Sequence, residues 1–128
     1  MTRKSVTSEN APKAIGPYSQ AVWTGDLIYC SGQTPIDPLT GKLVSGGIEE
    51  QTQQAFNNLG SVLASAGLSM ENVIKVNVYL TSMSNFAGMN QIYQQIFSAP
   101  YPARTTVAVA ELPLQALVEI ELIAQKNQ

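Results

Sequence analysis

Apolar and polar residues recur with helical spacing in two segments of the chain. From 48 to 66 the apolar positions share one face of a helix, and Gly67 follows where a left-handed cap is usual. The segment 85–97 carries a second apolar stripe, and Ser82 or Ser84 can cap its amino end. The pattern therefore predicts two amphipathic helices, each with one face in the core.

Other segments have the alternation or the composition of strands. Residues 19–32 predict a hairpin that turns at 24–26, and the turn-rich segment 37–42 predicts a further reversal or a loop. The segment 73–80, "VIKVNVYL", is rich in β-branched residues and alternates polar with apolar positions, which indicates a strand.

Two more strands are expected after the second helix. Pro100 and Pro102 break that helix, and the segments 105–111 and 117–125 follow with strand-like composition. Strands and helices in this order are typical of an α+β fold in which helices cover one face of a mixed sheet. The uncovered face would need a partner, so the pattern favours an oligomer.

The composition is that of one folded domain. With 128 residues and 45% hydrophobic content, we expect a single domain over 1–128, in which residues 1–12 form a tail leading into the first strand. Charged residues make up 12% of the chain. Because average proteins contain about 25%, few charges are present to cover the surface of a monomer. That shortage again favours a homo-oligomer.

The charge balance and the residues that are missing argue against several functions. A net charge of -2 without a cluster of Lys or Arg argues against nucleic-acid binding. With no histidine and only Cys30, the chain has no residues for a zinc site or a Cys–His pair, so we expect no metal and no cofactor. No apolar run approaches the roughly 18 residues of a membrane span, and the amino end lacks the apolar core of a signal peptide. We expect a cytoplasmic protein without membrane contact.

Two glutamates and one arginine are the candidates for chemistry. In "VEIELIA" at 118–124, side-chain alternation sends Glu119 and Glu121 to the same side of a strand. Either both are solvated glutamates on a half-exposed strand, or one lies in a cleft facing Arg104 from the adjacent strand. Arg104 is the only arginine outside the amino-terminal tail. Taken alone it is either a surface or salt-bridging residue or a functional one.

Several motifs along the chain resemble those of one family. They are "AIGPYSQAV" at 14–22, "SGQTPIDPLTG" at 31–41, "NVYL" at 77–80, and "PAR" at 102–104 followed by "ELPLQALVEIE". All occur in order between about Ala11 and Ala124. In this arrangement they are similar to the RidA/YjgF family of reactive-intermediate deaminases, also described as endoribonuclease L-PSP or translation inhibitor.

The resemblance implies a fold, an assembly and an activity. The expected fold is similar to that of chorismate mutase, and three copies form a homotrimer with three clefts between subunits. The activity is hydrolysis of 2-imino acids, which pyridoxal-phosphate-dependent dehydratases release from threonine or serine, to 2-keto acids and ammonia. Its partners are therefore small 2-imino and 2-keto acids.

The resemblance also implies the residues of the site. An arginine matching Arg104 holds the substrate carboxylate, and a glutamate matching Glu119 orients the attacking water. The other positions that match residues of the pocket are Tyr18, Ser31, Gly32, Asn90 and Thr106, the last through the nearby backbone.

The chemistry of these side chains fits such roles. A planar guanidinium can hold a carboxylate through two parallel hydrogen bonds, and a carboxylate can pass a proton from water to a departing nitrogen. Considered alone, Tyr18 is equally well a core tyrosine, and Asn90 an ordinary residue of a helix surface. Gly32 either ends a strand tightly or lets backbone approach a ligand.

The chain departs from many deaminase-active members directly after the arginine. Those members have serine and then cysteine, whereas this chain has Thr105 and Thr106. Since the cysteine side chain is not the nucleophile of the implied mechanism, we expect activity to survive. The size of the pocket and any regulation through a thiol are the properties that the change affects.

Two alternatives to a deaminase remain. One is a trimeric module that binds or senses 2-keto acids through the same arginine without turnover. The other is the endoribonuclease of the older family description. An acidic chain without histidine has neither the usual phosphate-binding surface nor the usual acid–base pair for RNA cleavage, which argues against this second alternative.

Overall fold

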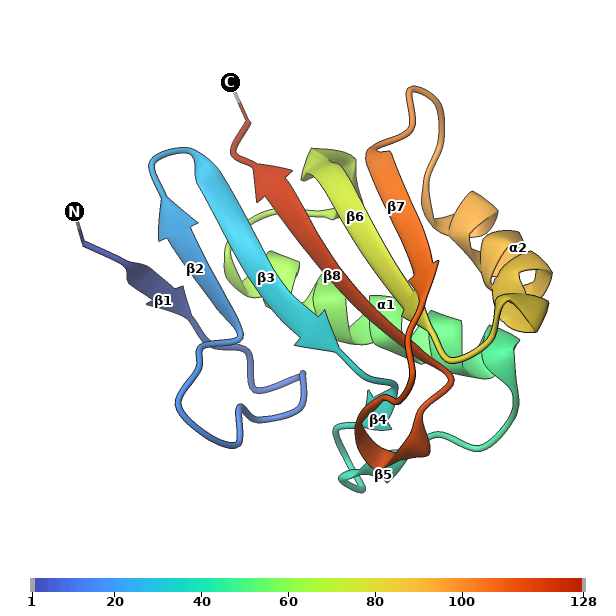
Figure 1. Cartoon of the computed structure of the whole chain (residues 1–128). Coiled ribbons are helices and arrows are strands. Elements are labelled where there is room, and N and C mark those ends of the chain that lie inside the picture. Colours follow the sequence, from blue (N-terminus) through green and yellow to red (C-terminus); the bar gives the residue numbers. More distant parts are fainter. Residues whose placement is uncertain (1, 128) are drawn as a thin grey trace.

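The computed structural model describes residues 2–127 and contains one large sheet with both long helices on the same face (Figure 1). The strands are β1 (Lys4–Val6), β2 (Ala21–Thr24), β3 (Leu27–Gln33), β4 (Ile36–Asp37), β5 (Lys42–Leu43), β6 (Val73–Leu80), β7 (Ala103–Ala108) and β8 (Val118–Gln125). The helices are α1 (Ile48–Ser65) and α2 (Phe86–Ile96), with short 3₁₀ turns at Met70–Asn72, Met83–Asn85 and Pro113–Gln115.

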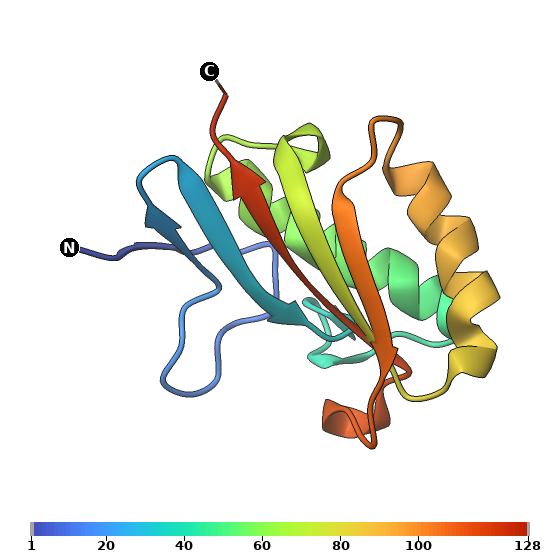
Figure 2. The ribbon, with the colours of Figure 1, turned by 45° about the horizontal axis from the view of Figure 1, so that its top comes forward.

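The sheet is mixed, as the order of elements predicts. Its strand order is β1-β2-β3-β8-β6-β7, and β4 pairs with β5 in a small separate hairpin. The pairing of β6 with β7 is parallel, and the other pairs of the large sheet are antiparallel. In Figure 2, α1 passes behind this sheet and α2 lies past β7, so neither helix covers the face of the sheet turned toward the viewer. The expected α+β class with two helices on one face is therefore confirmed.

The predicted helices are confirmed to within a residue or two at each end. The first, expected over 48–66, is α1, and the second, expected over 85–97, is α2. Of the two candidate caps, Ser82 accepts a hydrogen bond from the backbone N–H of Ser84 at 3.2 Å. This bond caps the 3₁₀ turn that leads into α2, so the cap lies one turn earlier than a direct helix cap.

Two strand predictions need correction. The strand expected over 105–111 is β7, which begins two residues earlier and ends at Ala108. Its partner β6 ends at Leu80, whose carbonyl accepts the last cross-strand hydrogen bond from Val109 N–H at 2.7 Å. The segment expected as an amino-terminal tail contains β1, which pairs with β2 from Lys4 to Val6. Three residues are too short to show an alternating pattern, so the sequence did not reveal β1.

The core lies between the sheet and the two helices. Alternate residues of β8 point toward the helices and are buried, namely Val118, Ile120, Leu122 and Ala124. On the helices, Phe56 of α1 meets Tyr93 of α2 and Phe97 in edge-to-face contacts, with ring centroids 5.9 and 5.6 Å away. These aromatic contacts fix α2 against α1 beside the β7 edge of the sheet.

The start of α2 approaches the start of α1 very closely. A Cβ atom at Gly88 would lie 2.5 Å from Cγ2 of Ile48, too close for any real side chain at that position. Gly60, inside α1, differs in this respect, because a Cβ there would meet only Cε of Met70 at 3.7 Å. Gly88 therefore sets the separation of the two helices, whereas Gly60 does not.

We expect opposite effects from alanine at these two helical glycines. Gly88→Ala forces the helices apart and should lower the free energy of unfolding by about 1–3 kcal/mol. Gly60→Ala adds helix propensity without a clash and should raise it by about 0.5–1 kcal/mol. Urea unfolding of both variants checks this, and equal effects would contradict the assigned packing.

Candidate functional site

Arg104 lies on the helix side of the sheet, against α2. Its Nη1 donates a hydrogen bond to Oδ1 of Asn90 at 2.7 Å. The guanidinium carbon lies 4.5 Å from the ring centroid of Tyr93 and 5.5 Å from that of Phe86. Among residues 2–127 no carboxylate forms a salt bridge with this guanidinium, so most of its N–H donors are available to a ligand. Arg104 is thus half-buried but not salt-bridged.

A hollow of about 480 Å³ lies beside this guanidinium. It is lined by Asn90, Tyr93, Gln94, Tyr101, Pro102 and Arg104. The lining combines one positive charge with aromatic and amide groups, a combination suited to a small organic anion. Of the residues predicted from the sequence, Asn90 and Arg104 are in this group. The bond from Arg104 also makes Asn90 more than an ordinary helix-surface residue.

Glu119 lies on the uncovered face of the sheet. On β8 it is opposite Tyr79 of β6, and its neighbour on the same face is Glu121. Burial, and secondarily the negative charge of Glu121, raise the pKa of the Glu119 carboxyl above its usual value. Within the described residues no hydrogen bond holds this carboxylate. Glu119 is therefore a poorly solvated base that is free to bind a water molecule.

Glu121 is held by hydrogen bonds where Glu119 is not. The Tyr79 hydroxyl donates to its Oε1 at 2.8 Å, and Nδ2 of Asn77 lies 3.4 Å from its Oε2. The bond to Glu121 is the main cause that raises the pKa of Tyr79, which keeps the phenol protonated. The alternation places these two glutamates on the same face. Glu121 is bound to Tyr79 and Asn77 and has a structural role, whereas Glu119 has no hydrogen-bond partner within residues 2–127.

Gly32 lies directly beneath the Glu119 carboxylate. A Cβ atom at this position would overlap Oε2 of Glu119, and the carboxyl carbon would be 3.1 Å away. The sequence argument left open whether Gly32 ends a strand tightly or lets backbone approach a ligand. The structure shows a close approach, and the approaching group is the carboxylate of Glu119.

Ser31 directly precedes Gly32 on β3, and Tyr18 lies on the segment before β2. The Ser31 hydroxyl donates to the backbone carbonyl of Ser19 at 2.6 Å, which joins β3 to that segment. Tyr18 is 53% exposed, so its alternative interpretation as a core tyrosine is wrong. Its hydroxyl accepts a long hydrogen bond from the backbone N–H of Ile15 at 3.4 Å.

The predicted residues therefore form two groups on opposite faces of the sheet. Arg104 pairs with Val76 of β6, which in turn lies opposite Leu122, and all three positions face the helices. Glu119 belongs to the alternate positions of β8 that face away from the helices. β7 and β8 are also separated by β6, so the expectation that Arg104 comes from the strand adjacent to Glu119 is wrong. One copy of the chain does not bring these two side chains together.

The two threonines after Arg104 are likewise divided between the faces. Thr105 faces away from the helices, where its hydroxyl accepts a hydrogen bond from Nζ of Lys75 at 2.9 Å. Thr106 lies on the Arg104 side, and its buried Oγ1 has no partner among residues 2–127. Thr106 therefore brings an unpaired hydroxyl to the side of the sheet on which Arg104 lies.

Sequence reasoning did not identify Tyr93 and Phe86 as residues of this site. Both were recognised only as members of the apolar stripe of the second helix. Phe86 lies four residues before Asn90 and Tyr93 three residues after it, which places all three on one face of α2. That spacing was the signal available in the sequence.

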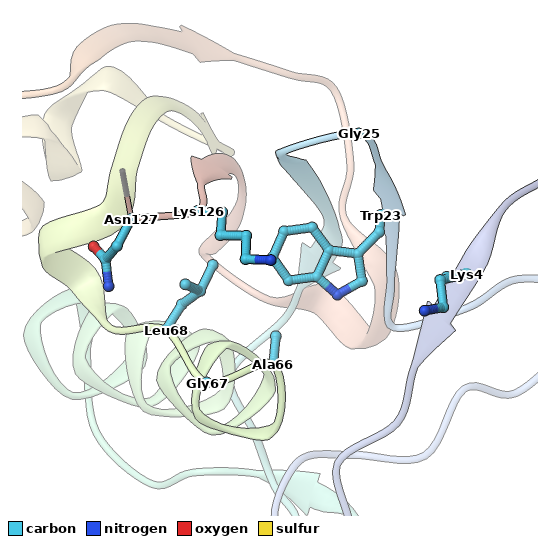
Figure 3. A pocket seen from close by; sticks show the side chains of 8 residues that line it. All are labelled: Lys4, Trp23, Gly25, Ala66, Gly67, Leu68, Lys126 and Asn127. Carbon is cyan, nitrogen blue, oxygen red and sulfur yellow. The ribbon is translucent and has the colours of Figure 1, made fainter.

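A second hollow, of about 420 Å³, lies past the carboxyl end of β8 (Figure 3). Lys4, Trp23, Leu68 and Lys126 are among its lining residues, and none of the predicted site residues is. Because Trp23 is the only tryptophan of the chain, its fluorescence reports on this end of the molecule and not on the surroundings of Arg104.

Two further properties of residues 2–127 concern metals and membranes. No three His, Cys, Asp or Glu side chains in this range cluster as metal ligands. None of the helices there is long and apolar enough to span a membrane.

The fold and these residues define a small α+β protein with a half-buried arginine suited to an organic anion. The family model described as Endoribonuclease L-PSP matches residues 8–126, and the chain belongs to this family, which is also known by the names RutC and RidA.

Relatives cover nearly the whole chain. A RutC family protein of Pyrococcus horikoshii is 48% identical over 98% of this chain and 99% of its own length. The 2-iminobutanoate/2-iminopropanoate deaminase of Bos taurus is 45% identical over 97% of this chain and 90% of its own. The crystal structure of E. coli TdcF with bound serine has a TM-score of 0.92 and 38% identity, covering 97% of this chain and 99% of that one.

The negative charge of Glu121 provides a test of the surroundings of Glu119. Because the folded chain raises the pKa of Glu119, this group favours folding below its usual value of 4.5, and the contribution is lost as the pH rises through the raised pKa. Glu121→Gln keeps an acceptor for Tyr79 but removes the charge, so the pKa of Glu119 should fall.

Titration of the glutamate carboxyl carbons by NMR measures this shift. Glu71→Gln, in the 3₁₀ turn before β6 and at the opposite end of that strand from Tyr79, is the matched control and should leave the pKa of Glu119 unchanged. A rise, or no change, in Glu121→Gln would contradict the proposed effect of Glu121.

Proposed function

We propose that the chain is a 2-iminobutanoate/2-iminopropanoate deaminase, which hydrolyses 2-imino acids to 2-keto acids and ammonia. The observation that carries the proposal is the half-buried Arg104 guanidinium, which contacts Asn90 and Tyr93 and has no carboxylate partner among residues 2–127. A planar cation held in this way is suited to the carboxylate of a small acid. The name of the relative from Bos taurus supports the choice of imino acids.

The guanidinium fixes the position of the reacting carbon. Of its five N–H donors, one is used by Asn90, and two of the others can hold both carboxylate oxygens of the substrate. The imine carbon is directly bonded to that carboxylate, so its place is then determined. Since this carbon is already electrophilic, correct placement of a water molecule supplies much of the catalysis.

Glu119 is the base of the proposed reaction. It accepts a proton as the oxygen of water forms a bond to the imine carbon, and the electron pair of the C=N bond moves to nitrogen. The proton then passes to that nitrogen, which gives a carbinolamine. Glu119 next takes the proton of the new hydroxyl group as the C=O bond forms and the C–N bond breaks with its electron pair on nitrogen. That second proton passes to the departing nitrogen, and ammonia and the 2-keto acid leave. The raised pKa of Glu119 suits these transfers, because it brings the carboxyl closer to a neutral working pH.

The site requires two copies of the chain. Arg104 and Glu119 lie on opposite faces of the sheet, and two strand spacings separate β7 from β8. The uncovered face also exposes large apolar side chains, since Tyr29 is 45% exposed and Val107 is 41% exposed. A second copy would cover them, and a chorismate-mutase-like homotrimer would place Arg104 of one subunit opposite Glu119 of the next in three clefts.

Residues near Glu119 complete the proposed pocket. Gly32 leaves the space that the carboxylate occupies, and Ser31 and Tyr18 lie on the segments that border it. Asn90 and the backbone at Thr106 belong to the Arg104 side. Nothing in this arrangement requires a metal or a cofactor, because the guanidinium and the carboxylate supply the charges that the reaction uses.

Loss of Arg104 should abolish the activity. In an assay coupled to a threonine dehydratase, the wild-type protein should accelerate formation of 2-ketobutyrate. Arg104→Ala should lower kcat/KM about 100-fold or more, because two charge-assisted hydrogen bonds of about 1.5–3 kcal/mol each are lost. The control is Arg3→Ala, which removes the other arginine and should have no effect.

The same assay separates the deaminase from a binding protein. If wild-type protein leaves the rate unchanged, the deaminase proposal is wrong. Calorimetry that then shows 2-ketobutyrate binding, lost in Arg104→Ala, would identify a non-enzymatic 2-keto-acid binding protein instead.

A site shared between copies predicts complementation of inactive variants. Arg104→Ala and Glu119→Gln should each be inactive, but mixed trimers form some sites with both native residues. With random mixing, about one quarter of the sites should be complete, since each needs the right subunit on both sides. Co-refolding of the two variants, followed by the coupled assay, measures this. Continued inactivity of the mixture, with trimers confirmed by light scattering, would place both residues in one chain.

A further inference from the structure

The side chains around Arg104 are arranged to hold its guanidinium in one plane. Phe86, Asn90 and Tyr93 all come from one face of α2, spaced by four and three residues. The guanidinium carbon lies 4.5 Å from the ring centroid of Tyr93 and 5.5 Å from that of Phe86. Asn90 accepts a hydrogen bond from one N–H group. α2 thus supplies every contact that the structure records for the Arg104 guanidinium.

We propose that Tyr93 is a positioning residue for the proposed deaminase reaction, and that it acts through its ring by fixing the plane of the Arg104 guanidinium. The consequence for catalysis rests on the proposed function, whereas the contact itself does not. Tyr93 covers one face of the guanidinium and Asn90 binds one of its N–H groups, while Arg104 lines the hollow beside α2, so its remaining N–H groups can bind a ligand there. An arginine side chain without this support would sample many rotamers and hold a carboxylate less tightly.

Tyr93 is itself held rigidly by the core. It is 5% exposed, and its ring contacts Phe56 at 5.9 Å and Phe97 at 4.8 Å between centroids. Because Phe56 and Phe97 pack against the Tyr93 ring, the position of the ring is set by the core. The guanidinium of Arg104 therefore takes the orientation that the ring favours. This is the difference between a positioning residue and a side chain that merely lies nearby.

The hydroxyl of Tyr93 contributes nothing to this role. Its oxygen is buried and has no hydrogen-bond partner within residues 2–127. A phenylalanine ring would cover the guanidinium equally well and would leave no unpaired polar atom in the core. The proposal therefore predicts that phenylalanine can replace Tyr93 and that an aliphatic residue cannot.

The two arginines of the chain make the contact directly observable. Arg3 and Arg104 should give two Nε–Hε signals in a ¹H–¹⁵N NMR spectrum of the assembled protein. Ring currents of Tyr93 and Phe86 should move the Arg104 signal away from that of the exposed Arg3 and slow its exchange with water. In Tyr93→Leu the Arg104 signal should move toward the Arg3 position, because only the ring of Phe86 remains beside it, and in Tyr93→Phe it should not.

Ligand affinity provides the second measurement. Tyr93→Leu should weaken binding of 2-ketobutyrate about 5- to 10-fold, the range expected for a partly desolvated cation–π contact. KM in the coupled assay should rise by the same factor, with a smaller change in kcat. Tyr93→Phe should restore affinity to within about twofold.

Phe97→Leu is the matched control for loss of core packing. It removes a ring from the same aromatic cluster, but among residues 2–127 the guanidinium of Arg104 lies over the rings of Tyr93 and Phe86 and not over that of Phe97. It should lower Tm about as much as Tyr93→Leu. Because Tyr93 still covers the guanidinium and Phe56 still packs against Tyr93, the Arg104 signal and the affinity should change much less than in Tyr93→Leu. If both leucine variants weaken binding equally, Tyr93 has only a structural role and the inference is wrong.

A double-mutant cycle completes the test. In an Arg104→Lys background the planar fork is absent, so Tyr93→Leu should cost little further affinity. Full additivity would overturn the inference. A deaminase assay that shows no activity would end the proposed function, yet the NMR shift and its loss in Tyr93→Leu would still decide the positioning of Arg104 by Tyr93.

Discussion

Side-chain alternation in a twisted sheet is the constraint on which the candidate site depends. Each strand position faces one side only, and both helices of this protein cover the same side. Arg104 falls on the covered side, where α2 can hold it, and Glu119 falls on the open side, where it keeps a raised pKa. Arg104 and Glu119 therefore lie on opposite faces of the sheet. This separation underlies the proposed activity, the proposed assembly and the proposed role of Tyr93.

The sequence predicted those parts of the structure that depend on local pattern. The alternation in 118–124 placed Glu119 and Glu121 together, and the helical stripe in 85–97 placed Tyr93 toward the core. It failed where placement depends on pairing between distant segments. Nothing local shows that β7 pairs in parallel with β6 and not with β8, so the position of Arg104 relative to Glu119 was wrong.

The role of small residues was also beyond sequence reasoning. A glycine after Ser31 is compatible with a turn, a strand end or a close contact, and only the position of the Glu119 carboxylate distinguishes them. Thr105 and Thr106 were considered as one departure from the family pattern. In the sheet they have different environments, because one binds Lys75 on the open face and the other has an unpaired hydroxyl on the helix side. Adjacent residues of a strand face opposite sides of the sheet, so each needs its own physical explanation.

The contact between Gly88 and Ile48 has a consequence for how this family can vary. It sets how close α2 lies to α1, and α2 carries Asn90 and Tyr93 on the same short helix. A larger residue at 88 would displace these side chains relative to the sheet unless position 48 became smaller at the same time. We therefore expect positions 48 and 88 to covary in volume among homologues, so that a pair of residues outside the pocket preserves the geometry within it.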